Sequence, residues 1–203
     1  KTAKVLPPPA SLADYLAARK NLGIERTLIV QASAYGKDNS LLLKSMADMG
    51  PSARGIVIVD DTVTDAELER LTKLGVRGIR FFMLAGAPLP IELLEPMAAR
   101  VAPFGWTINF QTDGRLLGDF EALLKRVPTT VTIDHVGKFL EPVEPDHEGF
   151  KAMLRLLDGH ELTVACTRAF QGQAERFELL LASHEAGEAS RGSRRQAGPV
   201  GHN

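Results

Sequence analysis

The sequence has few of the features that mark several classes of protein. It contains a single cysteine, Cys166, so no disulfide can form within the chain, and a reducing, cytoplasmic compartment is expected. No apolar run approaches the roughly 20 residues that span a bilayer, and residues 1–9 lack the apolar core of a signal peptide. The formal net charge is -1, which provides no overall attraction to nucleic acid or to a membrane.

Signatures of bound cofactors are missing as well. The sequence has no H-x-H, no H-E-x-x-H and no pair of cysteines, so no residue can be assigned as a metal ligand. No glycine-rich nucleotide loop is present either, which argues against a dinucleotide-binding fold.

Strand and helix patterns alternate along most of the chain. The β-type runs cover 27–33, 54–59, 76–82, 106–111, 129–134 and 162–166. Apolar residues at helical spacing predict helices over 11–22, 39–49, 64–74, 90–101, 120–127 and 150–157. A strand–helix period of roughly 25 to 30 residues requires a parallel sheet with crossover helices. Six strands fit a doubly wound sheet, whereas a complete (β/α)8 barrel needs two more strands and about 250 residues.

The composition changes toward the C-terminal end. Residues 1–182 carry the strand and helix patterns and are expected to form one domain. From residue 183 onward large apolar side chains are almost absent, so 183–203 is expected to be a disordered tail. The basic run 190–195 is short, has no interleaved aromatic residue and is flanked by acids, so no nucleic-acid partner is expected.

Polar residues gather where the predicted strands end. In chain order they are Gln31, Ser33, Asp60, Asp61, Arg80, Asn109, Gln111, Asp134, His135 and Lys138. Parallel α/β folds place their pockets at the carboxyl ends of the strands. His135 is the candidate catalytic acid or base, while Arg80 and Lys138 supply positive charge for an anionic substrate. Ser33, Asn109 and Gln111 would orient that substrate through hydrogen bonds.

Each role has a structural alternative. His135 can simply cap its strand, and the sequence supports both interpretations equally. Arg80 can pair with a strand-end acid such as Asp60, although a guanidinium near a sheet interior favours a bidentate anionic partner. Asp60 is also typical of turns. Asp134 either orients His135 or closes the turn, and Ser33 has no adjacent base that would make it a nucleophile.

Several of these motifs together resemble a known family. The runs are 28–33 (LIVQAS) with Asp38-Asn39, 54–56 (RGI) with 59–60 (VD), 76–81 (VRGIRF), 105–106 (GW) and 133–138 (IDHVGK). In order and spacing they resemble the amidohydrolase-related TIM-barrel hydrolases, especially 2-pyrone-4,6-dicarboxylate lactonase and D-galactarolactone isomerase. The likeness runs from about residue 5 to about residue 161.

The resemblance implies a (β/α)8 barrel that is incomplete here, without its first strand and its last one or two strands. It also implies a hydrolase that acts on a small carboxylated lactone. By motif position Arg80 would hold a carboxylate, Ser33 would contact the substrate and His135 would be the pocket histidine. The family includes metal-independent members and members that use a divalent metal such as zinc, so the cofactor stays open. A lactone isomerase, or a non-catalytic barrel fragment that binds small carboxylates, is the alternative.

The sequence also departs from the family pattern. The H-x-H of the first strand and the aspartate of the last strand, which is the expected general base, have no counterpart here. Gly86 stands where the lactonase has a second substrate arginine, Gln111 where it has a pocket tyrosine, and Lys138 where it has an arginine. These differences weaken the expectation of a pyrone dicarboxylate substrate. An incomplete barrel also has two unpaired sheet edges, so a homo-oligomer is a possible outcome.

Overall fold

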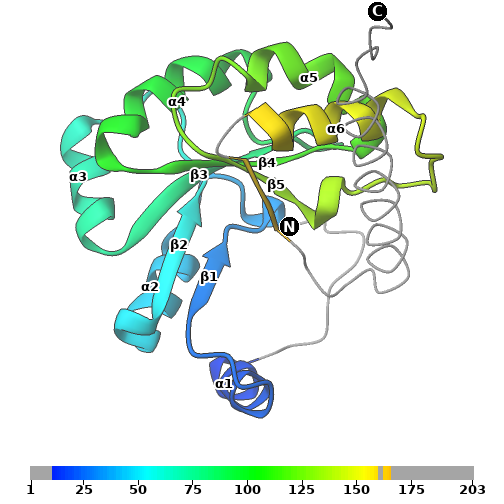
Figure 1. Ribbon diagram of the computed structural model, residues 1–203. Coiled ribbons are helices and arrows are strands. Elements are labelled where there is room, and N and C mark those ends of the chain that lie inside the picture. Colours follow the sequence, from blue (N-terminus) through cyan, green and yellow to red (C-terminus); the bar gives the residue numbers. More distant parts are fainter. Residues whose placement is uncertain (1–10, 160–161, 166–203) are drawn as a thin grey trace, which may run out of the picture.

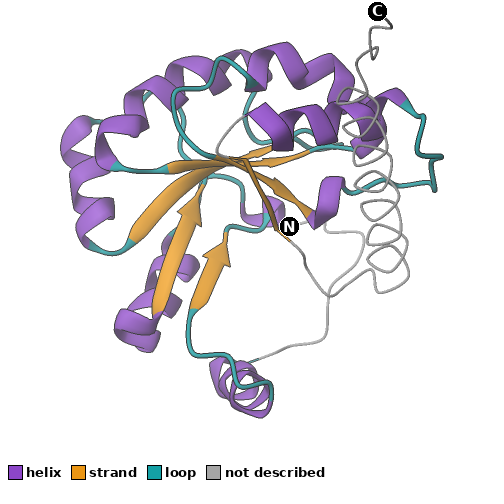
Figure 2. Ribbon diagram, in the orientation of Figure 1, coloured by secondary structure: helices purple, strands orange, loops and turns teal. Residues whose placement is uncertain are grey.

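The fold is a curved parallel sheet with helices on its outer side (Figures 1 and 2). A computed structural model describes residues 11–159 and 162–165. The sheet has six strands in chain order, with every neighbouring pair parallel. They are β1 (Thr27–Val30), β2 (Ala53–Val57), β3 (Val76–Phe82), β4 (Thr107–Gln111), β5 (Val131–Asp134) and β6 (Leu162–Ala165). A sheet whose strands follow the chain order and curve in one direction is what part of a (β/α)8 barrel requires.

The helices alternate with the strands. They are α1 (Leu12–Asn21), α2 (Ser40–Met49), α3 (Asp65–Lys73), α4 (Leu94–Val101), α5 (Leu117–Leu124) and α6 (Glu148–Gly159). The sequence places Asp14 three residues after the potential N-cap Ser11, a spacing close to that of a capping box, and the two side chains form this box at the start of α1. Thr64 accepts a hydrogen bond from Glu67 N at the start of α3, over 3.2 Å. None of the helices in the described ranges combines the length and the hydropathy needed to cross a bilayer.

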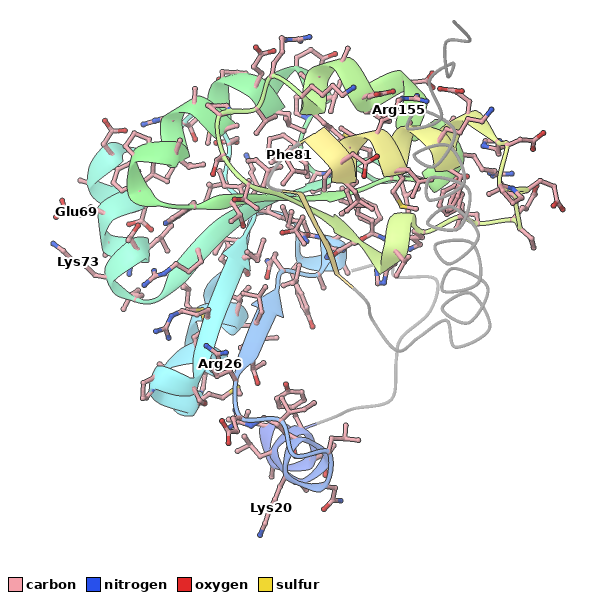
Figure 3. All side chains as sticks on the ribbon, in the orientation of Figure 1. Lys20, Arg26, Glu69, Lys73, Phe81 and Arg155 are labelled. Carbon is pink, nitrogen blue, oxygen red and sulfur yellow. The ribbon has the colours of Figure 1, made fainter. Side chains whose placement is uncertain are left out.

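The hydrophobic core lies between the sheet and the helices. Phe81, Ile108, Phe110 and Ile133 point outward from their strands and are buried among helix residues. Phe110 meets Phe120 of α5 edge-on, with ring centroids 5.2 Å apart. Figure 3 shows Phe81 inside the molecule, whereas Lys20, Glu69 and Lys73 point away from it. Because side chains alternate along a strand, the residues between these core positions face the inner side of the sheet.

Strand β1 differs from its prediction. The run 27–33 is typical of a strand buried on both faces, yet β1 is short and Leu28 is 52% exposed. The reason is its position, because β1 is the first strand of the sheet and, within the described residues, pairs only with β2. Its apolar composition therefore marks it as an exposed edge of the described sheet.

Other boundaries shift by a few residues. Pro90 was expected within a first helical turn, but it precedes the 3₁₀ turn Ile91–Leu93, and α4 starts only at Leu94. The sequence offers Asn39 or Asp38 as the cap of α2. Asn39 occupies the N-cap position, but its side chain bonds both backbone groups of Ile58, with Nδ2–O and N–Oδ1 distances of 2.8 and 3.0 Å. Asp38 Oδ1 accepts a hydrogen bond from Ser40 N, the first residue of α2, over 3.1 Å. The predicted domain boundary near residue 182 and the predicted tail 183–203 lie outside the described residues.

Candidate active site

The carboxyl ends of β3, β4 and β5 bring four polar side chains together on the inner face of the sheet. Arg80 is directly aligned with Asn109, and Gln111 follows two residues later on the same face. The β4–β5 register, which pairs Phe110 with Ile133, places Asp134 level with Gln111. We call Arg80, Asn109, Gln111 and Asp134 the Arg80 cluster. None of the four is more than 9% exposed.

Arg80 is a buried cation held by protein acceptors. Its Nη1 donates to the backbone oxygen of Gln31 over 2.6 Å. Its Nη2 donates to Gln111 Oε1 and, over 3.3 Å, to Asp134 Oδ2. Burial lowers the pKa of Arg80 and the charge of Asp134 opposes this change, but an arginine remains protonated in proteins. The site therefore contains a permanent positive charge that Asp134 partly neutralises.

Asp134 also fixes the neighbouring amide. Asn109 Nδ2 donates to Asp134 Oδ1 over 2.8 Å, so the amide oxygen of Asn109 must point elsewhere. Among the described residues, Arg80 Nε and Asn109 Oδ1 are buried without a hydrogen-bond partner. Buried polar atoms without partners are uncommon and are concentrated where a ligand or a rearrangement can satisfy them. The Arg80 cluster thus has unused hydrogen-bonding capacity.

His135 follows Asp134 on a left-handed turn. His135, Val136, Gly137 and Lys138 have φ angles of 54, 52, 81 and 45°. The turn closes through a hydrogen bond of 3.0 Å from Lys138 N to His135 O. A β-branched residue such as Val136 is a genuine outlier in this region of backbone space, and such strain is concentrated at functional sites. The turn directs the chain sharply away from the strand at the position of the candidate catalytic residue.

The surroundings of His135 favour its neutral form. Partial burial lowers the pKa of His135 below its usual 6.5, the charge of Asp134 opposes this, and the charges of Lys138 and Arg80 lower the pKa further. A neutral imidazole can accept a proton at neutral pH. The structure therefore fits His135 as a base or a proton shuttle.

Ser33 and Lys138 lie on the loops that follow β1 and β5. Ser33 begins the 3₁₀ turn Ser33–Tyr35 and is half-buried. Gln31 shapes this loop by donating its amide to Gly36 O and Asp38 O over 3.2 and 2.7 Å. In the described part of the chain, no side-chain hydrogen bond joins Ser33 or Lys138 to the Arg80 cluster. Their contribution to substrate binding stays a prediction.

The alternative pairing of Arg80 with Asp60 is wrong. Asp60 is ion-paired with Lys37, which is the main reason why the pKa of Asp60 falls to about 2, and Thr62 contributes further hydrogen bonds. Thr62 N donates to Asp60 Oδ1 over 3.1 Å, as expected of a turn residue. The acid that pairs with Arg80 is Asp134, two strands away in the sheet.

Sequence reasoning missed the loop after β4. Asp113 is 5% exposed and forms an ion pair with Arg115, with an Nη2–Oδ2 distance of 2.5 Å. Gly114 N donates to Lys138 O over 3.3 Å, so this loop supports the turn that carries His135. The adjacent Asp113-Gly114 was the available signal, since this pair directly after a β-type run marks a tight, structured turn.

Within 11–159 and 162–165, no three His, Cys, Asp or Glu side chains come together in a way that could hold a metal ion. The donors in the described residues therefore do not fit a metal centre.

Comparison with known sequences decides the family. Residues 1–188 match the amidohydrolase family. The chain belongs to this family. It is 33% identical over 154 residues to a D-galactarolactone isomerase of Agrobacterium fabrum, and this covers 74% of the chain and 53% of the relative. It is 32% identical over 160 residues to a 2-pyrone-4,6-dicarboxylate hydrolase of Comamonas testosteroni, covering 78% and 52%. The chain spans about half the length of these curated amidohydrolases.

Solved structures agree with the fold. An apo crystal structure from Agrobacterium tumefaciens superposes with a TM-score of 0.75 at 32% identity, covering 82% of this chain and 61% of the other. A probable 2-pyrone-4,6-dicarboxylic acid hydrolase from Acinetobacter baumannii gives a TM-score of 0.73 at 20% identity, covering 91% and 73%, and supports the fold alone. The predicted fold class, an incomplete (β/α)8 barrel of the amidohydrolase family, is confirmed.

Proposed function

We propose that this amidohydrolase is a lactone hydrolase that acts on a small lactone carrying a carboxylate. The observation that carries the proposal is the buried arginine Arg80, which lies at the carboxyl end of the sheet and pairs with Asp134, the residue directly before His135. Arg80 has a buried Nε without a partner, and His135 stands next to the acid that holds Arg80. A cation for the carboxylate and a proton-transfer group for the ring ester are what hydrolysis of a carboxylated lactone requires.

The residues divide the work by their chemistry. Arg80 attracts the substrate carboxylate, and Lys138 adds positive charge at the edge of the site. Asn109, Gln111 and Ser33 orient the ring through hydrogen bonds. His135, neutral at pH 7, polarises the lactone carbonyl through a proton that it holds, or accepts a proton from water during attack on that carbonyl.

Lactone isomerisation is the second candidate. It is favoured by the 33% identity to a D-galactarolactone isomerase, which equals or exceeds the identity to the hydrolases. Hydrolysis gives an open-chain acid, whereas isomerisation moves the ring ester to another hydroxyl. Product analysis separates the two reactions, because only hydrolysis consumes water.

The wider context of the proposal follows from the sequence. We place the protein in the cytoplasm, which the single cysteine supports. We expect a small carboxylate or lactone as its ligand, without a nucleic-acid partner. A homo-oligomer is compatible with the exposed apolar edge strand β1.

The test is turnover of a matched set of lactones, followed by NMR of the products. The set contains 2-pyrone-4,6-dicarboxylate, D-galactarolactone, γ-carboxy-γ-butyrolactone and the uncharged γ-butyrolactone. We expect saturable turnover of at least one carboxylated lactone, and loss of about 100-fold or more in His135→Ala. His147→Ala is the control, since His147 accepts a hydrogen bond from Gly149 N at the start of α6. Equal turnover in both variants would refute the role of His135.

A further inference from the structure

Asp134 has a property that binding and catalysis at this site do not explain. Its carboxylate is buried at 6% exposure and accepts hydrogen bonds from Arg80 and Asn109. The Arg80 guanidinium is also the group proposed to hold a ligand carboxylate. The ligand-free protein thus already places a carboxylate against the cation of the site.

The contact between the two is long for an ion pair. Charge-assisted N–H···O hydrogen bonds are typically about 2.7–2.9 Å long, whereas Arg80 Nη2 and Asp134 Oδ2 are 3.3 Å apart. It is a single contact and leaves Arg80 Nε without an acceptor. A ligand carboxylate that approached the guanidinium more closely would form a stronger hydrogen bond than the 3.3 Å contact of Asp134, and would displace it.

Resting on the proposed function, we propose that Asp134 is a specificity-determining residue that competes with the ligand carboxylate for Arg80. Its charge lowers the net positive charge of the described site, where Arg80 and Lys138 are the cations. Like charges in a buried site repel each other strongly. The site therefore selects lactones with one carboxylate over lactones with two.

Removal of this charge should not unfold the protein. In Asp134→Asn the new amide keeps an oxygen toward Arg80 Nη2. Its NH2 group would face Asn109 Nδ2, a clash of two donors, but Asn109 can rotate its amide by half a turn. Asn109 Oδ1, now buried without a partner, would then accept that hydrogen bond. The variant removes one charge and keeps the hydrogen-bond pattern.

A second variant moves the charge in the opposite direction. Gln111 Oε1 accepts a hydrogen bond from Arg80 Nη2, and Gln111 is almost completely buried. Gln111→Glu places a second carboxylate against the same guanidinium without a change of shape. The new carboxylate at position 111 would compete with the ligand for Arg80 more strongly than the amide does. The fold tolerates this carboxylate because the Arg80 guanidinium can pair with it.

The experiment is calorimetric titration of the full chain with γ-carboxy-γ-butyrolactone, 2-pyrone-4,6-dicarboxylate and the uncharged γ-butyrolactone. We expect Asp134→Asn to bind the monocarboxylate about tenfold more tightly, with a larger gain for the dicarboxylate. Gln111→Glu should bind both about tenfold more weakly. Affinity for γ-butyrolactone should not change in Asp134→Asn, because this lactone has no carboxylate that competes for Arg80. Glu121→Gln removes the same charge from α5, and its affinities should equal those of the unmodified chain. Circular dichroism checks that each variant is folded.

The outcomes separate the inference from the proposed function. Tight binding by the unmodified chain together with weaker binding by Asp134→Asn would overturn the competition and leave the carboxylate site intact. If Asp134→Asn does not fold, unchanged affinity in Gln111→Glu would overturn the competition by itself. No carboxylate binding by the folded unmodified chain or by either variant would overturn both proposals.

Discussion

Arg80 of β3 reaches past the intervening strand β4 to Asp134 of β5, and the two side chains form an ion pair 3.3 Å long. Both are at least nine-tenths buried. A buried pair of this kind contributes little net stability when it is complete, because desolvation offsets the attraction. The pair nevertheless determines the net charge of the candidate active site, because the Asp134 carboxylate partly neutralises the Arg80 guanidinium.

Replacement of one partner by an apolar side chain, which cannot keep its hydrogen bonds, should be costly. Arg80→Met leaves Asp134 buried without its cation, and we expect the free energy of unfolding to fall by about 3–5 kcal/mol. The double variant Arg80→Met with Asp134→Leu removes both charges and should recover most of this loss. Urea unfolding of the two single variants and the double variant measures the coupling. A double variant as unstable as the sum of the single variants would show that the pair is not coupled.

The contact between α6 and the loop after β4 leaves no space for a side chain. A Cβ atom at Gly149 would stand 2.2 Å from the backbone oxygen of Gly114. Because that neighbour is backbone, Gly149→Ala should push α6 away and lower the free energy of unfolding by about 1–3 kcal/mol. Gly118→Ala on α5 is the control: its Cβ would meet only Glu148 Cγ, at an ordinary 3.5 Å. That variant should be neutral or up to about 1 kcal/mol more stable, and equal destabilisation in both would contradict this account of the packing.

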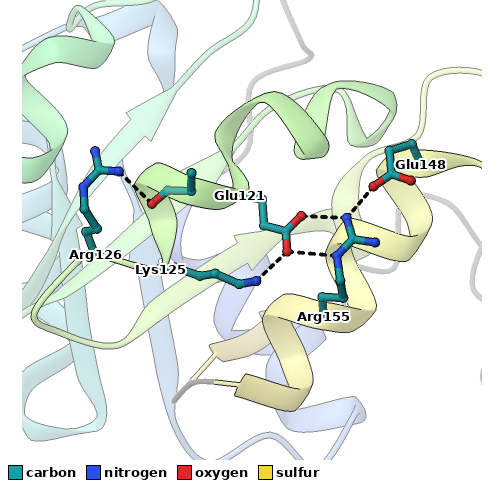
Figure 4. Close-up of polar contacts among 6 residues, drawn as sticks. Glu121, Lys125, Arg126, Glu148 and Arg155 are labelled. Atoms are coloured by element: carbon teal, nitrogen blue, oxygen red, sulfur yellow. Dashed lines mark hydrogen bonds and ion pairs between the residues drawn. The ribbon is translucent and has the colours of Figure 1, made fainter.

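Acid should weaken the contact between α5 and α6. Figure 4 shows the Glu121 carboxylate between Lys125 and Arg155, with N–O distances of 2.6 Å to Lys125 and of 2.9 and 2.6 Å to Arg155. These bonds, chiefly those to Arg155, lower the pKa of Glu121 from 4.5 to about 2. Because the folded-state pKa is the lower one, this stabilisation is present above about pH 4.5 and is lost as the pH falls toward about 2.

Glu121→Gln should therefore flatten the dependence of stability on pH in that window. Urea unfolding at several pH values between those limits measures the slope. Glu95→Gln is a matched control, since Glu95 bonds Arg126 at a more exposed position where salt bridges contribute less. If Glu95→Gln reduced the slope of unfolding free energy against pH more than Glu121→Gln does, the assignment of the acid sensitivity to Glu121 would be contradicted.

The alternation of strands and helices could be predicted because it depends on local patterns. The run 76–82 became β3 residue for residue, and the strand-end polar residues did come to one edge of the sheet. The capping pair Ser11 and Asp14 formed as its spacing predicted. Signals of this kind act within one turn or one strand, so a single sequence contains them.

Relationships across strands could not be predicted in the same way. The partner of Arg80 depends on the register of three strands, and the sequence alone suggested Asp60 as an example of that partner, not Asp134. The exposure of Leu28 depends on which strand forms the edge, and the tight contact of Gly149 depends on where α6 docks. Local propensities carry no information about strand register, about which strand forms the edge, or about where a helix docks.

The most direct test of the proposed site is NMR of the histidine side chains during titration with γ-carboxy-γ-butyrolactone. The account predicts that the His135 imidazole signals shift saturably and that those of His147 stay in place. It also predicts that the pKa of His135, now below 6.5, rises when the bound carboxylate offsets the charge of Arg80. Unchanged His135 signals and an unchanged pKa at saturating ligand would contradict the claim that Arg80 and His135 form one carboxylate-binding site.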